Sequence, residues 1–249
     1  MLKEERYQHI MDELQIRNRI LLTDIAAKLE VSEDTIRRDL KELHDLGKLK
    51  RVHGGAIARS FNPFSFHREE IYDHPNKALI AQKAVSLLKN GQAYLITGGT
   101  TNLELVNLIP KEMHCTFFTP SLPVAMQLSQ LPAVETILIG GRIVHDAQIA
   151  TGEEAWNLLG RIKVDLCFLG TGHLDAAFGL SEFDWDVVEL KRAMIKASKK
   201  VVLLTLSAKL NSTQRYQVCG LDAVHVLATE LHPDDPRLDK FRRPGLEIL

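Results

Sequence analysis

From residue 76 onward, short apolar runs alternate with segments whose apolar residues recur at helical spacing. The expected strands cover residues 93–97, 115–119, 135–139, 165–169, 201–206 and 224–228, and the expected helices cover residues 76–88, 102–109, 122–131 and 186–198. Such alternation predicts an α/β fold, a mainly parallel sheet covered by helices on both faces. Ligands of sheets of this kind bind outside the carboxyl ends of the strands.

Composition excludes several classes of protein. Apolar residues make up 45% of the chain and charged residues 25%, which is typical of a globular protein and not of a disordered or fibrous one. An uncharged apolar run of about 18 residues, as a membrane span needs, is absent. The first residues mix acids and bases, unlike a secretory signal peptide. We therefore expect a cytoplasmic protein without a membrane partner.

The three cysteines and ten histidines do not predict a metal centre. Cys115, Cys167 and Cys219 stand singly within apolar runs, which is typical of buried, reduced thiols. His67 and His74 lack further ligands at a recognisable spacing. We expect neither a metal nor a cofactor.

Positive charge is concentrated in one short segment. The whole chain has a formal net charge of -1, but residues 37–59 carry seven Lys or Arg against three Asp or Glu, a net of +4. Local clustering of this kind is typical of a surface that contacts a phosphate backbone, although a solvated helix face would have the same composition.

The same segment has the pattern of a helix-turn-helix. Residues 3–14 are amphipathic, residues 19–22 form a strand-like run, and Thr23 is a candidate N-cap for a helix that ends at Leu29. A turn follows, and Ser32 is placed to cap a second helix that buries Ile36, Leu40 and Leu43 and ends near Gly47.

That second helix would present its polar face to the major groove of DNA. Ser32, Thr35, Arg37, Arg38 and Lys41 lie on or beside this face, and arginine there binds guanine edges or phosphates. Basic and apolar residues then alternate up to Gly54 and Gly55, which predicts a small hairpin, or wing. Its candidate DNA contacts are Lys48, Lys50, Arg51 and His53.

In the larger region, glycine-bearing loops follow three expected strands. Gly98, Gly99, Thr100 and Thr101 follow the strand at 93–97 and open a helix, which is a favourable place for a phosphate. Arg142 follows Gly140 and Gly141, and a third loop spans 170–172. Glycine also suits any tight turn, and Arg142 also suits a surface ion pair, so both alternatives stay open.

The segment from Leu21 to Ile57 resembles the DNA-binding signature of the DeoR family of bacterial transcription regulators. The resemblance includes S-x-x-T-I-R-R-D-L (Ser32 to Leu40) and L-x-x-x-G-x-L-x-R-x-H-G-G-A (Leu43 to Ala56). It continues through G-G-T-T-x-L-E-L, I-G-G-R, F-L-G-T-G-x-L-D, E-L-K-R-A-M-I and S-A-K, which resemble the sensor domain of that family.

This resemblance implies a sensor domain related in fold to sugar-phosphate isomerases, with a phosphorylated sugar or a similar metabolite as effector. It implies a phosphate loop from Gly98 to Thr101, with Asp175, Lys191 and Lys209 as polar partners. Two positions differ from the family pattern, because Thr97 and Leu206 stand where acids are usual. Either the sugar end of the site has changed or the domain no longer binds a small molecule.

We expect a winged helix-turn-helix domain over residues 1–57, a linker over 58–75 and an effector-sensing and oligomerisation domain over 76–249. The expected function is sequence-specific regulation of a carbohydrate-metabolism operon, most simply repression, by a homodimer or homotetramer bound to a double-stranded DNA operator. A sugar-phosphate isomerase is the alternative enzyme, but kinship of fold does not confer catalysis, so we expect no catalytic residues.

Overall fold

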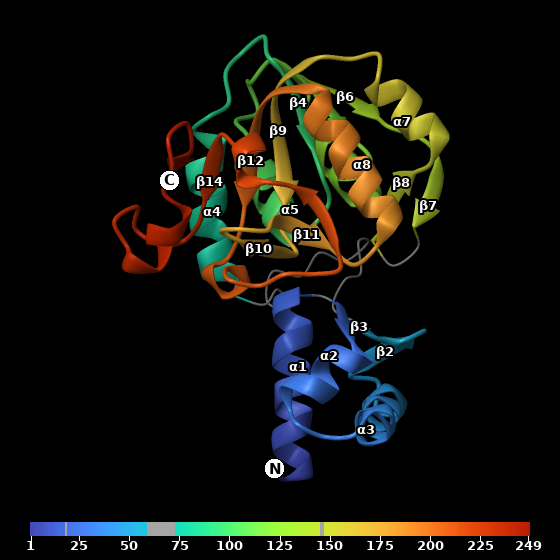
Figure 1. Ribbon diagram of the computed structural model, residues 1–249. Coiled ribbons are helices and arrows are strands. Elements are labelled where there is room, and N and C mark those ends of the chain that lie inside the picture. Colours follow the sequence, from blue (N-terminus) through green and yellow to red (C-terminus); the bar gives the residue numbers. More distant parts are fainter. Residues whose placement is uncertain (18, 59–72, 145–146) are drawn as a thin grey trace. The chain divides into compact units, whose positions relative to one another are not determined.

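The structure is a computed structural model of residues 1–249, and it describes all of them except residues 18, 59–72 and 145–146. The chain divides into two compact units, Met1–Tyr72 and Asp73–Leu249. Most of the expected linker over residues 58–75 lies outside the described residues. Each unit is therefore described by itself (Figure 1).

The N-terminal unit is a winged helix-turn-helix. Its elements are α1 (Lys3–Arg17), β1 (Arg19–Leu21), α2 (Leu22–Lys28), α3 (Glu33–Asp45), β2 (Leu49–Val52) and β3 (Gly55–Ala58). The strands form an antiparallel sheet in the order β1-β3-β2. One apolar core joins the helices and the sheet, and its fully buried side chains include Ile10, Leu14, Ile36, Leu40, Leu43 and Leu49.

The start of α2 differs from the sequence prediction. The helix begins at Leu22, and Thr23 lies inside its first turn instead of capping it. No side chain caps this end; the Leu22 amide instead donates to the Gly54 carbonyl at 2.8 Å. The wing backbone thus satisfies one of the first four amides of the helix, which have no partner within it, and the predicted cap at Thr23 was wrong.

The larger unit is built on a seven-stranded parallel sheet with the strand order β15-β14-β12-β9-β4-β5-β6. The strands are β4 (Ala93–Ile96), β5 (Cys115–Thr119), β6 (Val134–Leu138), β9 (Val164–Gly170), β12 (Ser198–Leu204), β14 (Val226–Ala228) and β15 (Glu247–Ile248). Every pairing between neighbours is parallel. The α/β class and the parallel sheet predicted from the alternating pattern are confirmed.

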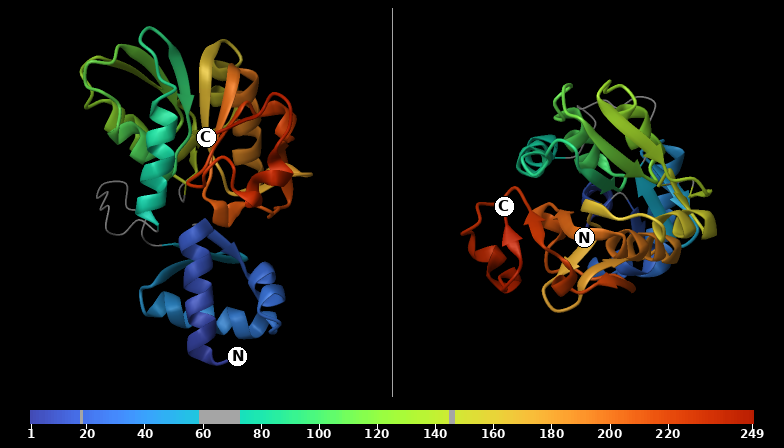
Figure 2. Two further views of the ribbon diagram at one scale, coloured as in Figure 1. Left: turned by 90° about the vertical axis from the view of Figure 1, so that its left-hand side faces the viewer. Right: turned by 90° about the horizontal axis from the view of Figure 1, so that it is seen from above.

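Helices cover both faces of this sheet (Figures 1 and 2). They are α4 (His74–Val85), α5 (Thr100–Asn107), α6 (Leu122–Leu128), α7 (Glu153–Leu159) and α8 (Trp185–Lys196). The chain steps from β4 through α5 to β5 in one direction along the sheet, and from β9 through α8 to β12 in the other. Since such crossovers are right-handed, α5 and α8 lie on opposite faces.

Alternate residues of the central strand β4 fill two different cores. Leu95 packs with Cys167 and Leu203 in the larger cluster, which includes α8. Tyr94 points to the other face, where its ring centroid lies 5.0 Å from that of Phe117 and 6.0 Å from that of Phe168. All six side chains are fully buried, which fixes the register of the central strands and the position of the loops at their ends.

Two small antiparallel sheets were not predicted. One contains β10 (His173–Asp175), β11 (Gly179–Glu182) and β13 (Tyr216–Cys219), and the other contains β7 (Arg142–Val144) and β8 (Ile149–Thr151). Short 3-10 turns also occur at Ser207–Lys209, Leu221–Ala223 and Pro236–Phe241. β8 runs beside Ser121 at the end of β5, so the extra strands border the carboxyl edge of the main sheet.

The cysteines are free thiols, as expected. Cys115 and Cys167 are buried and Cys219 is partly buried. Burial raises the pKa of Cys115 and of Cys219 to about 11 and that of Cys167 to about 12. The thiols therefore stay protonated at neutral pH, which suits packing and disfavours metal binding or nucleophilic chemistry.

Candidate functional sites

The exposed face of α3 and the first wing strand form one basic surface. Arg37, Arg38 and Lys41 project from α3, and Arg51 projects from β2. Together with Asp34 they line a shallow hollow in the N-terminal unit. Asp34 forms an ion pair with Arg37. The hollow thus brings together four of the predicted DNA contacts and one acid that the prediction did not include.

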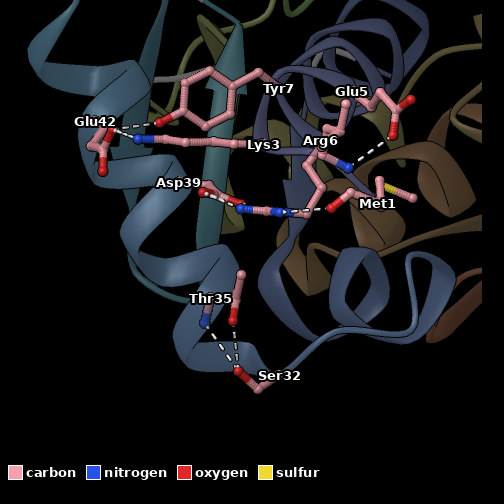
Figure 3. Close-up of polar contacts among 10 residues, drawn as sticks. Met1, Lys3, Glu5, Arg6, Tyr7, Ser32, Thr35, Asp39 and Glu42 are labelled. Carbon is pink, nitrogen blue, oxygen red and sulfur yellow. Dashed lines mark hydrogen bonds and ion pairs between the residues drawn. The ribbon is translucent and has the colours of Figure 1, made fainter.

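Ser32 and Thr35 hold the start of α3. The Thr35 amide donates to Ser32 Oγ at 3.2 Å, and the two hydroxyl oxygens lie 2.9 Å apart (Figure 3). Ser32 is therefore the predicted N-cap. The two hydroxyl groups are hydrogen-bonded to each other, and Ser32 Oγ also accepts from an amide of the first turn. These bonds keep the amino end of the helix ordered.

The end of α3 sets the direction of the wing. Gly47 has a φ of 74°, its amide donates to the His44 carbonyl, and the Lys48 amide donates to the Leu43 carbonyl. This is the Schellman arrangement, which requires a left-handed residue. Lys48 precedes β2, and Lys50 and Arg51 lie in it. All three predicted contacts are exposed, as is His53 in the turn of the hairpin.

A polar clamp between α1 and α3 was not predicted. Arg6 binds the Asp39 carboxylate with two hydrogen bonds, of 2.7 Å from Nε and 3.1 Å from a terminal nitrogen (Figure 3). Asp39 is only 3% exposed. One turn further on, Lys3 Nζ and the Tyr7 hydroxyl both bind Glu42, at 2.5 and 2.7 Å. These acids therefore orient the helix that carries the basic face.

In the larger unit, the predicted phosphate loop lies at the carboxyl end of β4. Gly98 and Gly99 follow the strand, and Thr100 and Thr101 open α5. Gly99 has a φ of 108°, a conformation that side chains other than glycine rarely adopt, and a Cβ at Gly98 would come within 3.0 Å of Ser121 Oγ. The backbone amides at the start of this eight-residue helix suit an anion.

Thr97 ties the ends of two strands together. Its Oγ1 accepts hydrogen bonds from the Gly170 amide at 2.9 Å and from Asn102 Nδ2 at 2.8 Å. Asn102 Nδ2 also donates to the carbonyls of Thr97 and Gly98. Thr97 is 6% exposed, and Leu206 is 2% exposed. At both positions where the family pattern has an acid, the residue present is buried and uncharged.

Two of the predicted effector residues bind the loop at the end of β9. Lys191 Nζ donates to the Gly170 carbonyl at 2.7 Å and to Glu182 at 2.5 Å. Lys209 Nζ donates to the Thr171 carbonyl at 2.7 Å. A Cβ at Gly170 would lie 3.2 Å from the Gly98 carbonyl, so the structure brings both lysines to the loop that adjoins the predicted phosphate loop.

The other two predicted effector residues have partners elsewhere. Arg142 begins β7, is exposed, and forms an ion pair with Asp186 on α8. Asp175 ends β10, and its Oδ1 accepts from the amides of Ala177 and Phe178, each at 2.8 Å. These amide hydrogen bonds lower the pKa of Asp175. Both contacts are ones that a purely structural residue would make.

Other classes of site find no support in the residues that the structure describes. Within that part of the chain, no three His, Cys, Asp or Glu side chains gather as ligands for a metal ion. Among the described helices, none has the length and apolar character needed to cross a membrane.

Comparisons with known proteins match both units. Residues 6–61 match the DeoR-like helix-turn-helix domain, and residues 73–231 match the DeoR C terminal sensor domain. The HTH-type transcriptional regulator GolR of Listeria innocua is 30% identical over 250 residues, which are 100% of this chain and 98% of the relative. The HTH-type transcriptional repressor GlcR of Bacillus subtilis is 30% identical over an alignment of 261 residues, which covers 100% of this chain and 96% of the relative.

Among solved structures, ribose 5-phosphate isomerase A of Methanocaldococcus jannaschii aligns with a TM-score of 0.40 and 16% identity, over 54% of this chain and 53% of that chain. The sensor-domain match alone spans residues 73–231, well over half of the sequence, and the helix-turn-helix match accounts for most of the remainder. On this basis the chain belongs to the DeoR family of transcriptional regulators.

Proposed function

We propose that this protein is a sequence-specific repressor of a carbohydrate-metabolism operon. The observation that carries the proposal is the basic hollow on α3 and β2, which Arg37, Arg38, Lys41 and Arg51 line. An exposed cationic helix beside a basic wing fits the major groove and the adjoining phosphates. The name of the relative GlcR includes the word repressor, which favours repression over activation.

We further propose a homodimer or homotetramer that acts on chromosomal DNA in the cytoplasm. One winged module reaches only a half-site, and paired half-sites about one helical turn apart need two modules. The effector is proposed to be a phosphorylated sugar or a related metabolite, with its phosphate at Gly98–Thr101. The amides and hydroxyls at the start of α5 support this assignment.

Arg38 is the residue we expect to contribute most to base recognition. Arg37 is held by Asp34, whereas no described residue forms an ion pair with Arg38. Replacing Arg38 with Ala should weaken specific operator binding by ~1–3 kcal/mol. Fluorescence anisotropy with a labelled fragment of the protein's own promoter measures this change.

Two matched variants make that experiment specific. Lys48→Ala removes an exposed wing charge and should lower the slope of log affinity against log salt by about 1, with little change in sequence preference. Lys111→Ala removes an exposed charge from the larger unit and should leave binding unchanged. If Arg38→Ala bound the promoter as tightly as the unmodified protein, the proposed role of Arg38 would be refuted.

A catalytic role has little support. The carboxylate that an isomerase would need as a base is Asp175, which accepts two amide hydrogen bonds and has a lowered pKa, so it is a weak base. Lys191 is paired with Glu182 and with a backbone carbonyl. Turnover of ribose 5-phosphate by the purified protein would overturn this assessment.

A further inference from the structure

We propose that Asp34 is a specificity-determining residue of the DNA-binding surface, and that its carboxylate accepts a hydrogen bond from the amino group of a cytosine in the major groove. This inference rests on the proposed sequence-specific function and deepens it, because it names a base pair that the operator must contain. Asp34 was not predicted from the sequence as a DNA contact.

Asp34 lies on the same face of α3 as the cations of the basic surface. Arg37, Arg38 and Lys41 follow it by three, four and seven positions, which is the spacing of one helical face. All four residues line the same hollow, together with Arg51 of β2. Asp34 is therefore the first side chain of this face, at the amino end of the helix, where recognition helices reach the base edges.

The other acids near this face of α3 have different surroundings. Asp39 is buried, and both Asp39 and Glu42 are bound by side chains of α1. Glu33 is exposed, but it is not among the residues that line the hollow. Of the described residues that do line the hollow, Asp34 is the only acid, and contact with another helix does not explain its place there.

One oxygen of the Asp34 carboxylate is held and the other can accept a further hydrogen bond. Oδ1 accepts from Arg37 Nη1. The same guanidinium lies 4.0 Å from the Glu33 carboxylate, so Arg37 contacts both acids of the first turn. None of the described residues donates a hydrogen bond to Oδ2, and the Asp34 side chain is 72% exposed. Arg37 therefore positions the carboxylate and leaves one oxygen for a donor on the DNA.

The major groove offers few donors to a carboxylate. Guanine N7 and O6, adenine N7 and thymine O4 all accept, and the donors are the amino groups of cytosine and adenine. Adenine carries the acceptor N7 beside its amino group, which would repel a carboxylate, whereas cytosine presents the amino group alone. A carboxylate at this place therefore matches cytosine best, and the paired guanine presents acceptors to the cations of the same helical face.

A favourable interaction with the helix dipole is the alternative explanation for an acid in the first turn. That interaction needs only a negative charge near the end of the helix, and it holds equally for Glu33, one residue earlier. A base contact needs in addition the place of Asp34 in the hollow. The two explanations have different consequences, because losing a dipole interaction lowers stability without changing which base is preferred.

Binding of the full chain to variants of its own promoter fragment, with each base pair replaced in turn, tests the proposal. For the unmodified protein we expect one position in each half-site at which a C·G pair is preferred about tenfold. Asp34→Ala should reduce that preference to about twofold or less and leave the other positions unchanged. Asp34→Asn should shift the preference there to adenine, because an amide binds adenine N6 and N7 together. An unaltered preference profile in Asp34→Ala, or the loss of a preference for a pair that lacks cytosine, would overturn the proposal.

Glu33→Ala is the matched control, since it removes the neighbouring exposed acid from the same helical turn. It should lower the melting temperature about as much as Asp34→Ala does and leave every base preference unchanged. If Glu33→Ala removed the same preference, the effect would belong to the helix end and not to a contact, and the inference would fail.

The same measurements separate this inference from the function on which it rests. A protein that binds its promoter specifically, but whose Asp34→Ala variant keeps the full preference profile, would retain the proposed function and lose the role of Asp34. A protein that binds its promoter no more tightly than unrelated DNA would lose both.

Discussion

Lys77 on α4 is a buried lysine whose protonation opposes folding. It is 4% exposed, and burial lowers its pKa to about 8, although Asp73 and Glu104 favour the charged form. The unfolded chain therefore holds more protons than the folded one between about pH 8 and 10.5, so this group adds stability as the pH rises through that window. Over the whole window, the free energy of unfolding that Lys77 contributes rises by about 3 kcal/mol.

We expect Lys77→Met to lose stability relative to the unmodified protein as the pH rises. Urea unfolding of both proteins at pH 7.5 and pH 9.5 measures the change in their difference. The exposed Lys111→Met serves as the control and should show no such trend. Parallel pH profiles for Lys77→Met and the unmodified protein would contradict the assigned environment.

Single residues were predictable from sequence where the reason is local. Ser32 as a cap and Gly47 as a left-handed terminus follow from the residues next to them. Asp39 was predictable only as an acid in a basic segment, because its partner Arg6 is 33 positions away. The bond from Thr97 to Gly170 spans 73 positions, and no local pattern indicates it.

At the level of elements, the wing depends on the close approach of β3 to β1. A Cβ at Gly55 would lie 2.0 Å from the Ile20 carbonyl oxygen, whereas one at Gly54 would meet nothing within 4 Å. Gly54 has a φ of 75°, so Gly54→Ala should lower the free energy of unfolding by about 1–2 kcal/mol. Gly55→Ala should lower it by about 3 kcal/mol, because backbone must move. Thermal unfolding ranks the two; an equal loss would contradict the clash.

Elements with a clear apolar pattern were predicted well, and the others were missed. Six strands of the main sheet were expected from short apolar runs and α8 from its helical period, and the structure confirms them, whereas β15, of two residues, was not expected. β10, β11 and β13 have three or four residues each, too few for a period to appear, and they form only because they pair with one another. α2 was misplaced at its start because Gly54, from a distant hairpin, satisfies its first amide.

At the scale of the whole molecule, the proposed function requires that effector and operator affect one another. We expect the proposed phosphorylated-sugar effector to weaken operator binding by about 5- to 150-fold. Reciprocity then requires operator DNA to weaken effector binding by the same factor. Anisotropy titrations with and without effector, and calorimetry with and without operator, measure both factors. Two unequal factors, or none, would exclude direct coupling.

Asp34 gives the basic hollow a property beyond attraction. Its carboxylate is 72% exposed and lies beside Arg37 on the surface proposed to face DNA. A duplex docked out of register would press a phosphate against this negative group, and the repulsion would shorten the life of that complex. An acid in this place therefore trades some overall affinity for quicker release from the many rival sites of a chromosome, which leaves more of the protein free to find its target.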